Sequence, residues 1–342
     1  MKDLVSIVVP IYNMEGSIDK TINSLLSQDY ESYELILVDD GSTDRSYDLC
    51  KIREKADKRI KTIHTTNQGS GPARNHGIEN ARGKWIYFPD ADDLLVPNAL
   101  SKMMEGTNGG DCDLVVFGFR SIDTKGNIVS TKEYEDLVMD AEALRRDYSD
   151  CMTTSSRLGI QGAPWNKFFN LDVIRKYKVE YPPLRRHQDE GFIARYMCHA
   201  RKIHFISEVL YTYFTNDLRR EWQKYPVNYL DAVIGLNETR KNTILTWNDA
   251  DAITHDMIKR EYICNVIKAL ELSFSPKMKF NRIERKAWIA ESIKRTSIEN
   301  VVPPSIVGGY QKKILALIRS KRYFMLYYLL RLKIEIEKII KK

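Results

Sequence analysis

The chain has 342 residues, 43% of them hydrophobic and 29% charged, which is ordinary for a globular protein and enough for two domains or one enlarged domain. Its five cysteines include no C-x-x-C pair and argue against a disulfide framework, and no apolar run approaches the roughly 20 residues of a membrane-spanning helix. Because a strand is expected almost from Met1, there is no room for a signal peptide, and we expect a cytoplasmic protein.

The first hundred residues alternate between strands and helices. Apolar runs at 4–9, 35–38, 60–64 and 84–88 predict buried strands. Helices are expected between them, capped or begun near Ser17, near Ser42 or Asp44, and at Pro72. This alternation predicts an α/β fold with a mostly parallel, doubly wound sheet flanked by helices.

Four polar stretches each follow one of these strands, at 12–13, 39–40, 69–75 and 90–93. Ligands of such sheets bind where the carboxyl ends of the strands open, so we expect the four stretches to meet along one edge. Asp39 or Asp40 is placed to accept a hydrogen bond from a base, or only to cap the next helix. Gly69 and Gly71 would let the backbone approach an anion. Arg74 is placed to pair with phosphate or with the carboxylates.

The stretch Asp90-Ala91-Asp92-Asp93 puts three carboxylates within four positions at a strand end. Like charges packed this closely repel, so a cation is expected there, and oxygen ligands favour Mg²⁺ or Mn²⁺. Such ions take one or two protein carboxylates and leave the other positions to substrate phosphates. The alternative is an acidic, solvated turn before a helix that begins at Pro97.

Beyond residue 110 the pattern changes to a strand at 114–119, a hairpin within 121–130 and a helix at 139–150. In the stretch 185–192, carboxylates precede an apolar helix. One of them is either a general base or an acid that favours the helix dipole.

Helices are predicted from residue 216 onward, at 227–245, 250–274 and 282–295. The tail 311–342 holds ten basic and two acidic residues interleaved with apolar clusters. Such a segment suits the surface of an anionic membrane, or a docked C-terminal helix, or a homodimer contact. Since the positive charge is concentrated in this tail and no recognised module is visible, we expect no nucleic-acid binding.

Four motifs together resemble a family 2 glycosyltransferase of the GT-A fold: Val8-Val9-Pro10-Ile11-Tyr12-Asn13, Val38 to Asp44, Gly71-Pro72-Ala73-Arg74-Asn75-x-Gly77, and Asp90 to Asp93. The resemblance is strong over 3–100 and looser to 215. It implies a donor half at 1–110 and an acceptor half at 111–215, and the helical region at 216–342 lies outside it. The family builds cell-surface polysaccharides from nucleotide-diphosphate sugars on the cytoplasmic side, often on lipid carriers.

The resemblance also assigns roles to matching positions. The donor nucleotide would be bound by Pro10, Tyr12, Glu15, Asp39, Asp40, Arg74 and Asp90. The metal, Mn²⁺ or Mg²⁺, would be held by Asp92. The acceptor or diphosphate side would be formed by Trp165, Asn166, Lys167 and Glu190. Asp189 would be the catalytic base. Because Gln188 stands where the family usually has Glu, the alternative base is Glu190.

The implied reaction is an inverting, metal-assisted single displacement that moves a sugar to a hydroxyl of a glycan or lipid-linked glycan. The expected donor is a UDP-sugar, because UDP is the usual nucleotide of the family. Two alternatives remain at this point, a sugar-phosphate nucleotidyltransferase and a non-catalytic, membrane-associated scaffold with a degenerate sugar-nucleotide site. A dinucleotide-dependent oxidoreductase would need G-x-G-x-x-G after the first strand, and the chain has Pro10-Ile11-Tyr12-Asn13-Met14-Glu15 there.

Overall fold

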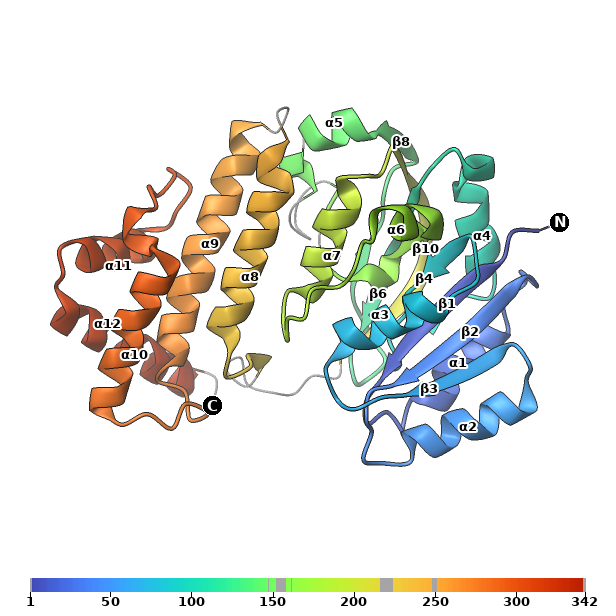
Figure 1. Ribbon diagram of the computed structural model, residues 1–342, viewed down its shortest axis with the longest axis horizontal. Coiled ribbons are helices and arrows are strands. Elements are labelled where there is room, and N and C mark those ends of the chain that lie inside the picture. Colours follow the sequence, from blue (N-terminus) through green and yellow to red (C-terminus); the bar gives the residue numbers. More distant parts are fainter. Residues whose placement is uncertain are drawn as a thin grey trace. The chain divides into compact units, whose positions relative to one another are not determined.

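The computed structural model describes residues 2–146, 148–151, 158–160, 162–215, 224–247 and 251–340. The chain forms two compact units: the first contains Met1–Pro183 and Gln188–Asp217, and the second contains Leu184–His187 and Leu218–Lys342. The first unit carries a central sheet and the second is helical (Figure 1). The expected division of the first unit near residue 110 stays a prediction.

One half of the sheet is parallel, in the order β3 (Ile60–His64), β2 (Tyr33–Asp39), β1 (Val5–Ile11) and β4 (Trp85–Tyr87). Helices α1 (Ile18–Leu26) and α2 (Ser46–Ala56) share a core cluster with the odd-numbered residues of β1. Helix α3 (Ser70–Asn80) covers the other face, where a Cβ on Gly77 would lie 2.1 Å from Cγ1 of Val8. Covering on both faces explains why β2 is buried throughout, and the predicted strand–helix alternation is confirmed.

The other half of the sheet is mixed and continues with β9 (Lys167–Asn170), β6 (Leu114–Ile122), β10 (Lys202–Phe214) and β5 (Leu94–Leu95). Strands β7 (Ile128–Lys132) and β8 (Leu137–Asp140) pair off this path with β6 and β10. Among the described strands of this half, β10 and β6 form the one parallel pair, and β9 is antiparallel to both β4 and β6. The α/β fold is confirmed, but parallel pairing dominates only the first half. Antiparallel strands need no helical crossover, so the strand–helix alternation that predicted the first half gives no signal here.

The remaining helices of the first unit are α4 (Ala99–Gly106), α5 (Ala141–Arg146), α6 (Leu171–Tyr177) and α7 (Gln188–Met197). The described residues also form short 3-10 helices, namely η1 (Asn108–Gly110), η2 (Tyr148–Asp150), η3 (Pro164–Asn166), η5 (Ile244–Thr246) and η6 (Ile298–Asn300). The helix predicted at 139–150 is wrong at its start. Met139 and Asp140 end β8, and α5 begins at Ala141 because the Asp140 carboxylate accepts a hydrogen bond from the backbone N–H of Ala143 at 2.7 Å.

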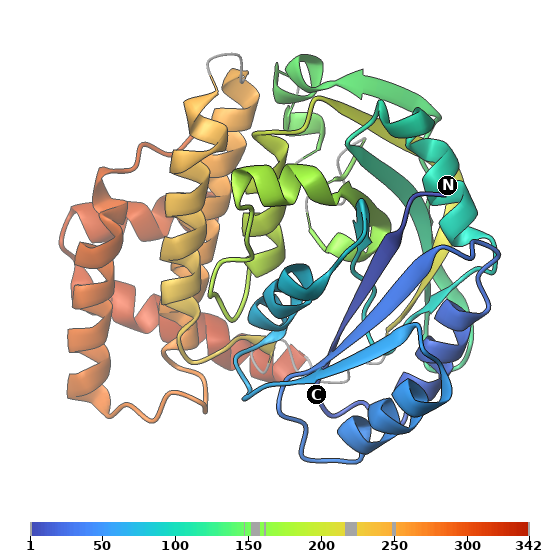
Figure 2. The ribbon, with the colours of Figure 1, turned by 45° about the vertical axis from the view of Figure 1, so that its right-hand side comes forward.

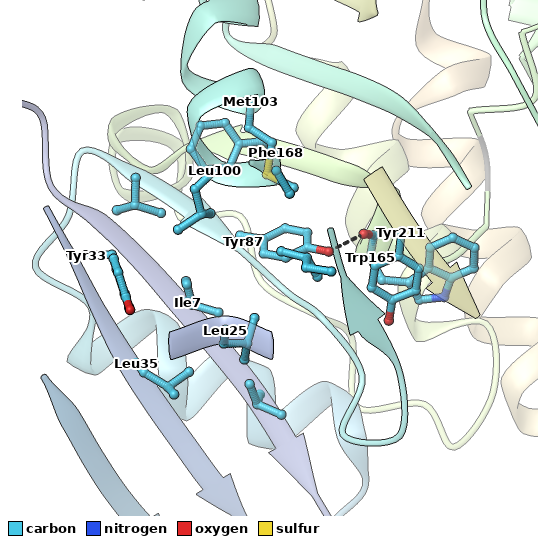
Figure 3. Packing of buried hydrophobic residues seen from close by; sticks show 14 of the residues in the cluster. Ile7, Leu25, Tyr33, Leu35, Tyr87, Leu100, Met103, Trp165, Phe168 and Tyr211 are labelled. Atoms are coloured by element: carbon cyan, nitrogen blue, oxygen red, sulfur yellow. Dashed lines mark hydrogen bonds between the residues drawn. The ribbon is translucent and has the colours of Figure 1, made fainter. Parts of the chain in front are cut away.

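A single core cluster joins the two halves of the sheet (Figure 3). Tyr87 of β4 is fully buried and donates its hydroxyl to the carbonyl oxygen of Trp165 at 2.7 Å. The indole of Trp165 in turn stacks on Tyr211 of β10, with ring centroids 4.7 Å apart. The residues that follow β4 are therefore tied to the second half of the sheet.

The second unit consists of α8 (Tyr229–Asn242), α9 (Ala252–Leu272), α10 (Arg282–Thr296), α11 (Gly309–Arg319) and α12 (Tyr323–Ile340). Helices α8 and α9 pack side by side (Figures 1 and 2). The start of α10 is fixed by a capping box between Asn281 and Glu284. None of the helices in the described part of the chain combines the length and the apolar character needed to cross a bilayer.

Candidate active site

The loop after β1 is stapled to the loop after β2. The backbone N–H of Asn13 donates to the hydroxyl of Ser42 at 3.0 Å, and the N–H of Thr43 donates to the side-chain oxygen of Asn13 at 2.8 Å. Asn13 adopts a left-handed backbone with φ of 55°, a conformation that asparagine tolerates better than most residues. The two loops are therefore one rigid platform at the edge of the sheet.

Three predicted donor residues lie on this platform or at the strand end next to it. Pro10 is half-buried near the end of β1, and Tyr12 is 44% exposed just beyond it. The carboxylate of Glu15 accepts a hydrogen bond from the backbone N–H of Arg45 at 3.1 Å, at the start of α2. Glu15 thus has a structural contact that needs no nucleotide, and its part in the ribose wall stays a prediction.

Asp39 is the last residue of β2 and Asp40 follows it, and the two carboxylates have different partners. One oxygen of the buried Asp39 lies 2.7 Å from Nδ1 of His64, whereas Oδ1 has no hydrogen-bond partner among the described residues. Both oxygens of Asp40 accept backbone N–H groups, from Gln68 at 2.8 Å and from Gly69 at 2.7 Å. Asp40 therefore holds the glycine loop, and Asp39 is the member of the pair with an unused acceptor.

Helix α1 holds the loop of residues 90–93 against the sheet. Ser17 occupies the N-cap position of α1 as predicted, but its hydroxyl donates to the carbonyl oxygen of Ala91 at 3.1 Å and makes no cap hydrogen bond. Thr21 donates to the carbonyl oxygens of Ala91 and Asp93, both at 3.0 Å. The carbonyl oxygens of Ala91 and Asp93 are therefore satisfied by α1 and its N-cap residue, which leaves the carboxylates of the loop to other partners.

Asp93 is the buried anchor of this loop. Its carboxylate accepts the Tyr211 hydroxyl at 2.7 Å and the backbone N–H of Phe214 at 2.9 Å. Burial raises the pKa of Asp93 to about 8, and the charge of Asp90 adds to the shift. The same Tyr211 hydroxyl accepts the backbone N–H of Asp90 at 3.1 Å, so β10 fixes the point where the loop begins.

Arg74 joins the acidic loop to the start of α7. Its Nη2 donates to Asp90 at 2.7 Å, and its Nη1 donates to Asp189 at 3.0 Å. The Arg74 side chain is only 3% exposed, whereas Asp90 and Asp189 retain 33% and 28% exposure. A buried cation between two partly open carboxylates can orient both of them while leaving oxygens for a ligand.

A second set of contacts holds α7 and the segment before it against α3. The amide of Asn75 and the backbone of Tyr181 exchange two hydrogen bonds, each 2.9 Å long. Gln188 donates to the hydroxyl of Ser70 at 3.0 Å, and a Cβ on Gly71 would lie 3.2 Å from Cγ of Gln188. This packing explains the Gly71 and Asn75 positions of the third motif by structure alone.

Asp189 has the electrostatics of a general base. Burial raises the pKa of Asp189 to about 6, opposed by the charge of Arg74 and reinforced by the charges of Asp90 and Glu190. Above that pH the carboxylate is ionised and still basic enough to accept a proton. Glu190 is half-buried in the first turn of α7.

Trp165, Asn166 and Lys167 sit between the two halves of the sheet. Asn166 accepts the Lys167 ammonium at 2.6 Å, and the ammonium also donates to the carbonyl oxygen of Ala163 at 2.8 Å. Lys167 is 1% exposed, and burial lowers its pKa to about 7, with Asp189 opposing the shift. Among the described residues no hydrogen bond or ion pair links Lys167 to Asp189, although both are predicted site residues.

An open cavity of about 620 Å³ lies next to Asp90. Its walls come from β6, β7, β10 and the segment around η3: Phe119, Ser121, Ser130, Thr131, Lys132, Gly159, Ala163, Trp165 and Tyr213. Trp165 is a wall of this cavity while its ring stacks on Tyr211 and Tyr213. An aromatic wall with hydroxyls beside it suits a sugar ring, which has apolar faces and a polar rim.

Asp92 is the predicted metal ligand. Burial and the nearby charge of Asp90 raise the pKa of Asp92, and no basic side chain pairs with it in the part of the chain that the structure describes. A divalent cation would relieve this repulsion, so the pair of carboxylates fits such an ion. The described residues contain no group of three or more His, Cys, Asp or Glu that could hold a metal alone, so the remaining ligands would come from elsewhere.

The four polar strand ends predicted to converge do converge, through the contacts of Asn13, Asp40 and Arg74. Sequence reasoning missed Tyr211, which fixes both Asp90 and the Trp165 ring. An alternation of aromatic residues at 211 and 213 was its only signal. It also missed Tyr181, over whose ring the Arg74 guanidinium lies at 5.5 Å.

The model of the family described as Glycosyl transferase family 2 matches residues 6–164. The chain is 31% identical over 245 residues to the putative glycosyltransferase EpsH of Bacillus subtilis. The matched region covers 69% of this chain and 67% of EpsH. Its fold is similar to that of S. aureus TarS 1-349 in complex with UDP-GlcNAc, with a TM-score of 0.69, 20% identity, and coverage of 96% of this chain and 90% of that one.

A more distant likeness in fold is to the mannosyltransferase PcManGT of Pyrobaculum calidifontis in complex with GDP-Man and Mn²⁺, with a TM-score of 0.54, 13% identity, and coverage of 96% and 84%. Both structural likenesses agree with the GT-A fold predicted from the motifs. On the family match and the extent of identity with EpsH, this chain belongs to glycosyl transferase family 2 and is a glycosyltransferase.

Proposed function

We propose that the chain transfers a sugar from a UDP-sugar to a hydroxyl of a glycan or lipid-linked glycan, with inversion at the anomeric carbon. The observation that carries this proposal is the buried Arg74 bridge between Asp90 and Asp189. It ties a carboxylate of the acidic loop, on the donor side, to a second carboxylate with a raised pKa. A single displacement needs the donor site and the catalytic base next to each other.

The nucleotide is assigned to the platform formed by the loops after β1 and β2. The buried Oδ1 of Asp39, which has no partner among the described residues, would accept the base N–H, and the exposed ring of Tyr12 offers a stacking surface. TarS, which shares the fold, binds UDP and UDP-GlcNAc, which supports a uridine nucleotide. Asp40 supports the pocket indirectly through the glycine loop.

Asp92, with Asp90 beside it, would hold the divalent metal. The Mn²⁺ complex of PcManGT supports this choice of ion. When bound, the ion would act as a Lewis acid that stabilises the negative charge of the departing diphosphate. Arg74 adds a fixed positive charge on the same side of the site.

The acceptor hydroxyl attacks the anomeric carbon from the face opposite the diphosphate. The new C–O bond forms as the bond to the diphosphate oxygen breaks, and the hydroxyl proton passes to Asp189. Arg74 contacts Oδ1 of Asp189, and no described residue donates to Oδ2, which leaves that oxygen for the acceptor. A positioned carboxylate of this kind contributes about 10² to 10⁴ to the rate.

The acceptor is assigned to the cavity beside Asp90. Its wall of Trp165 and Tyr213 offers an aromatic surface for a sugar ring, and Ser121 and Ser130 offer hydroxyls for the rim. These features favour a glycan over a small alcohol. The basic tail at 311–342 favours a reaction that takes place at the cytoplasmic face of a membrane.

Calorimetry with UDP, GDP, CDP and dTDP, each with and without Mn²⁺, tests the donor assignment. We expect UDP to bind best, to bind more weakly without metal, and to lose the metal effect in Asp92→Asn. The matched control is Asp172→Asn on α6, because that side chain is 66% exposed and far along the chain from the acidic loop. Equal binding of all four nucleotides, or a metal effect that survives in Asp92→Asn, would contradict the assignment.

The stereochemistry of the product tests the mechanism separately. Proton NMR of the anomeric signal during turnover should show the configuration opposite to that of the donor. Retention would exclude a single displacement with Asp189 as base, even if UDP binds as expected.

A further inference from the structure

Helix α12 carries an exposed apolar stripe. Its members are spaced four residues apart and lie on one side of the helix: Phe324, Tyr328, Leu332 and Ile336. Their exposed fractions are 67%, 43%, 55% and 41%. Large apolar side chains scattered singly on a surface are normal, but four in register along one helix form a continuous patch.

The opposite side of α12 is the one that packs on the second unit. Leu326, Leu330 and Ile334 are at most 1% exposed and, apart from the last, belong to its core cluster. They precede or follow the stripe by two residues, which corresponds to about 200° around a helix. The helix is therefore already docked through one face, and the stripe is a second apolar face whose members stay 41% to 67% exposed.

The stripe lies in the most basic part of the chain. Residues 311–342 have an excess of eight positive charges, whereas the whole chain has a net charge of +7, so the rest of the chain is close to neutral. Lys321 and Arg322 are exposed just before α12, and Arg331 is exposed beside the stripe. Arg282 of α10 reaches the hydroxyl of Tyr328 at 3.5 Å.

An apolar hollow of about 250 Å³ adjoins the N-terminal end of the stripe. It is lined by Lys286, Ile289, Ala290, Tyr323, Phe324 and Tyr327. The ammonium of Lys286 lies 5.8 Å from the ring centroid of Tyr327. The hollow thus combines apolar walls with a cation, the combination that a lipid with an anionic headgroup requires.

We propose that this α12 stripe binds the surface of an anionic lipid bilayer, with its aromatic and aliphatic side chains in the interfacial region and the surrounding cations on the headgroups. A second copy of the chain is the less suitable occupant. A two-fold contact through the stripe would bring two copies of the basic tail together, and their like charges would repel. An anionic surface would attract the same charges. The second unit thereby gains a function that does not depend on the transferase site.

Flotation of the full chain with lipid vesicles tests the proposal. We expect binding to vesicles of phosphatidylcholine with about 30 mol% phosphatidylglycerol, weak binding to phosphatidylcholine alone, and loss of binding as salt rises from about 0.05 to about 0.5 M. Replacing Phe324 and Leu332 together by serine should lower partitioning by about tenfold or more. Replacing Lys321 and Arg322 together by glutamate should lower it by at least about tenfold on anionic vesicles.

The matched control is Ile253→Ser, which removes an isoleucine that is 61% exposed on α9, outside the stripe. It should bind vesicles like the wild type, and all variants should keep their circular dichroism and UDP binding because the altered side chains are exposed. Equal binding by the Phe324/Leu332 variant and the wild type would overturn the proposal. Sedimentation that shows a wild-type dimer, dissociated by the same serine substitutions and indifferent to vesicles, would overturn it in favour of a contact between copies.

Discussion

Replacement of Asp189 by asparagine is expected to slow sugar transfer by orders of magnitude and, as the pH rises, to make the fold increasingly more stable than that of the wild type. Burial raises the pKa of Asp189 to about 6, with Arg74 opposing the shift, whereas a carboxyl in the unfolded chain titrates near about 3.9. The folded state therefore binds this proton more tightly than the unfolded state does. Ionisation of the carboxyl opposes folding, and asparagine cannot ionise.

The sign and the size follow from proton linkage. Because the folded pKa is raised, the stabilising contribution of the carboxyl is fully present below about pH 4 and is lost as the pH rises through about 6. Between pH 4.5 and 7.5 the loss for a fully buried group would be about 2 kcal/mol. Since the side chain keeps 28% exposure, we expect about 1 kcal/mol. Any constant loss from a weaker hydrogen bond to Arg74 cancels in the comparison of the two pH values.

Urea unfolding of both proteins at the two pH values measures this difference. A chelator should be present, because a cation at the acidic loop would add its own pH dependence. The Asp172→Asn variant on α6 controls for the general loss of a carboxylate, since its side chain is 66% exposed. The electrostatic reasoning is refuted if the gap between Asp189→Asn and the wild type is the same at both pH values, or moves against the variant at pH 7.5. Transfer should fall by about 10² to 10⁴ in the same variant.

Four further substitutions separate contacts that the structure places close together. Arg74→Lys keeps the charge but cannot reach both carboxylates with two nitrogens, so kcat/KM should fall by about 10²-fold; an unchanged kcat/KM would show that the bridge is dispensable. Tyr211→Phe removes the hydroxyl that serves Asp93 and the start of the acidic loop, and should lower the free energy of unfolding by about 1 to 3 kcal/mol in urea titrations. Asp39→Ala should weaken UDP binding in calorimetry by about tenfold or more, whereas Asp40→Asn should mainly cost about 1 kcal/mol of stability; the reverse ranking would exchange the roles of the two aspartates.

The sequence was a good guide to the parallel half of the sheet because the signals there are local. Each strand is an apolar run followed by a polar turn and a helix start, so each element can be recognised from residues that are close together in the sequence. Convergence of the polar strand ends followed from topology alone, and the option that Arg74 pairs with carboxylates is confirmed by its contacts with Asp90 and Asp189. The last contact spans 115 positions of the chain, yet its two members come from motifs that were each visible.

The mixed half of the sheet could not be predicted in the same way. Strand β9 has four residues, and β10 shifts register twice along its pairing with β6, so neither has a regular alternation to detect. Tyr211 is important because its ring stacks on Trp165 and its hydroxyl donates to Asp93. The spacing of these residues in the sequence contains no information about either contact. Acidic residues at the correct edge also cannot be ranked from sequence, since a carboxylate that faces a ligand and one that holds backbone amides are the same residue type.

The helical part of the chain is more than an appendage of the transferase fold, because four residues ahead of the proposed base belong to it. Leu184–His187 form part of the second unit, and the chain returns to the first unit at Gln188. Within the second unit, Leu184 packs so closely on α8 that a Cβ on Gly235 would lie 2.8 Å from it, and Nε2 of His187 lies 3.3 Å from the hydroxyl of Tyr229. The family match ends at residue 164 and includes none of these contacts. Asp189 follows this segment by two residues, so the chain directly ahead of the proposed base takes its packing partners from the helical unit.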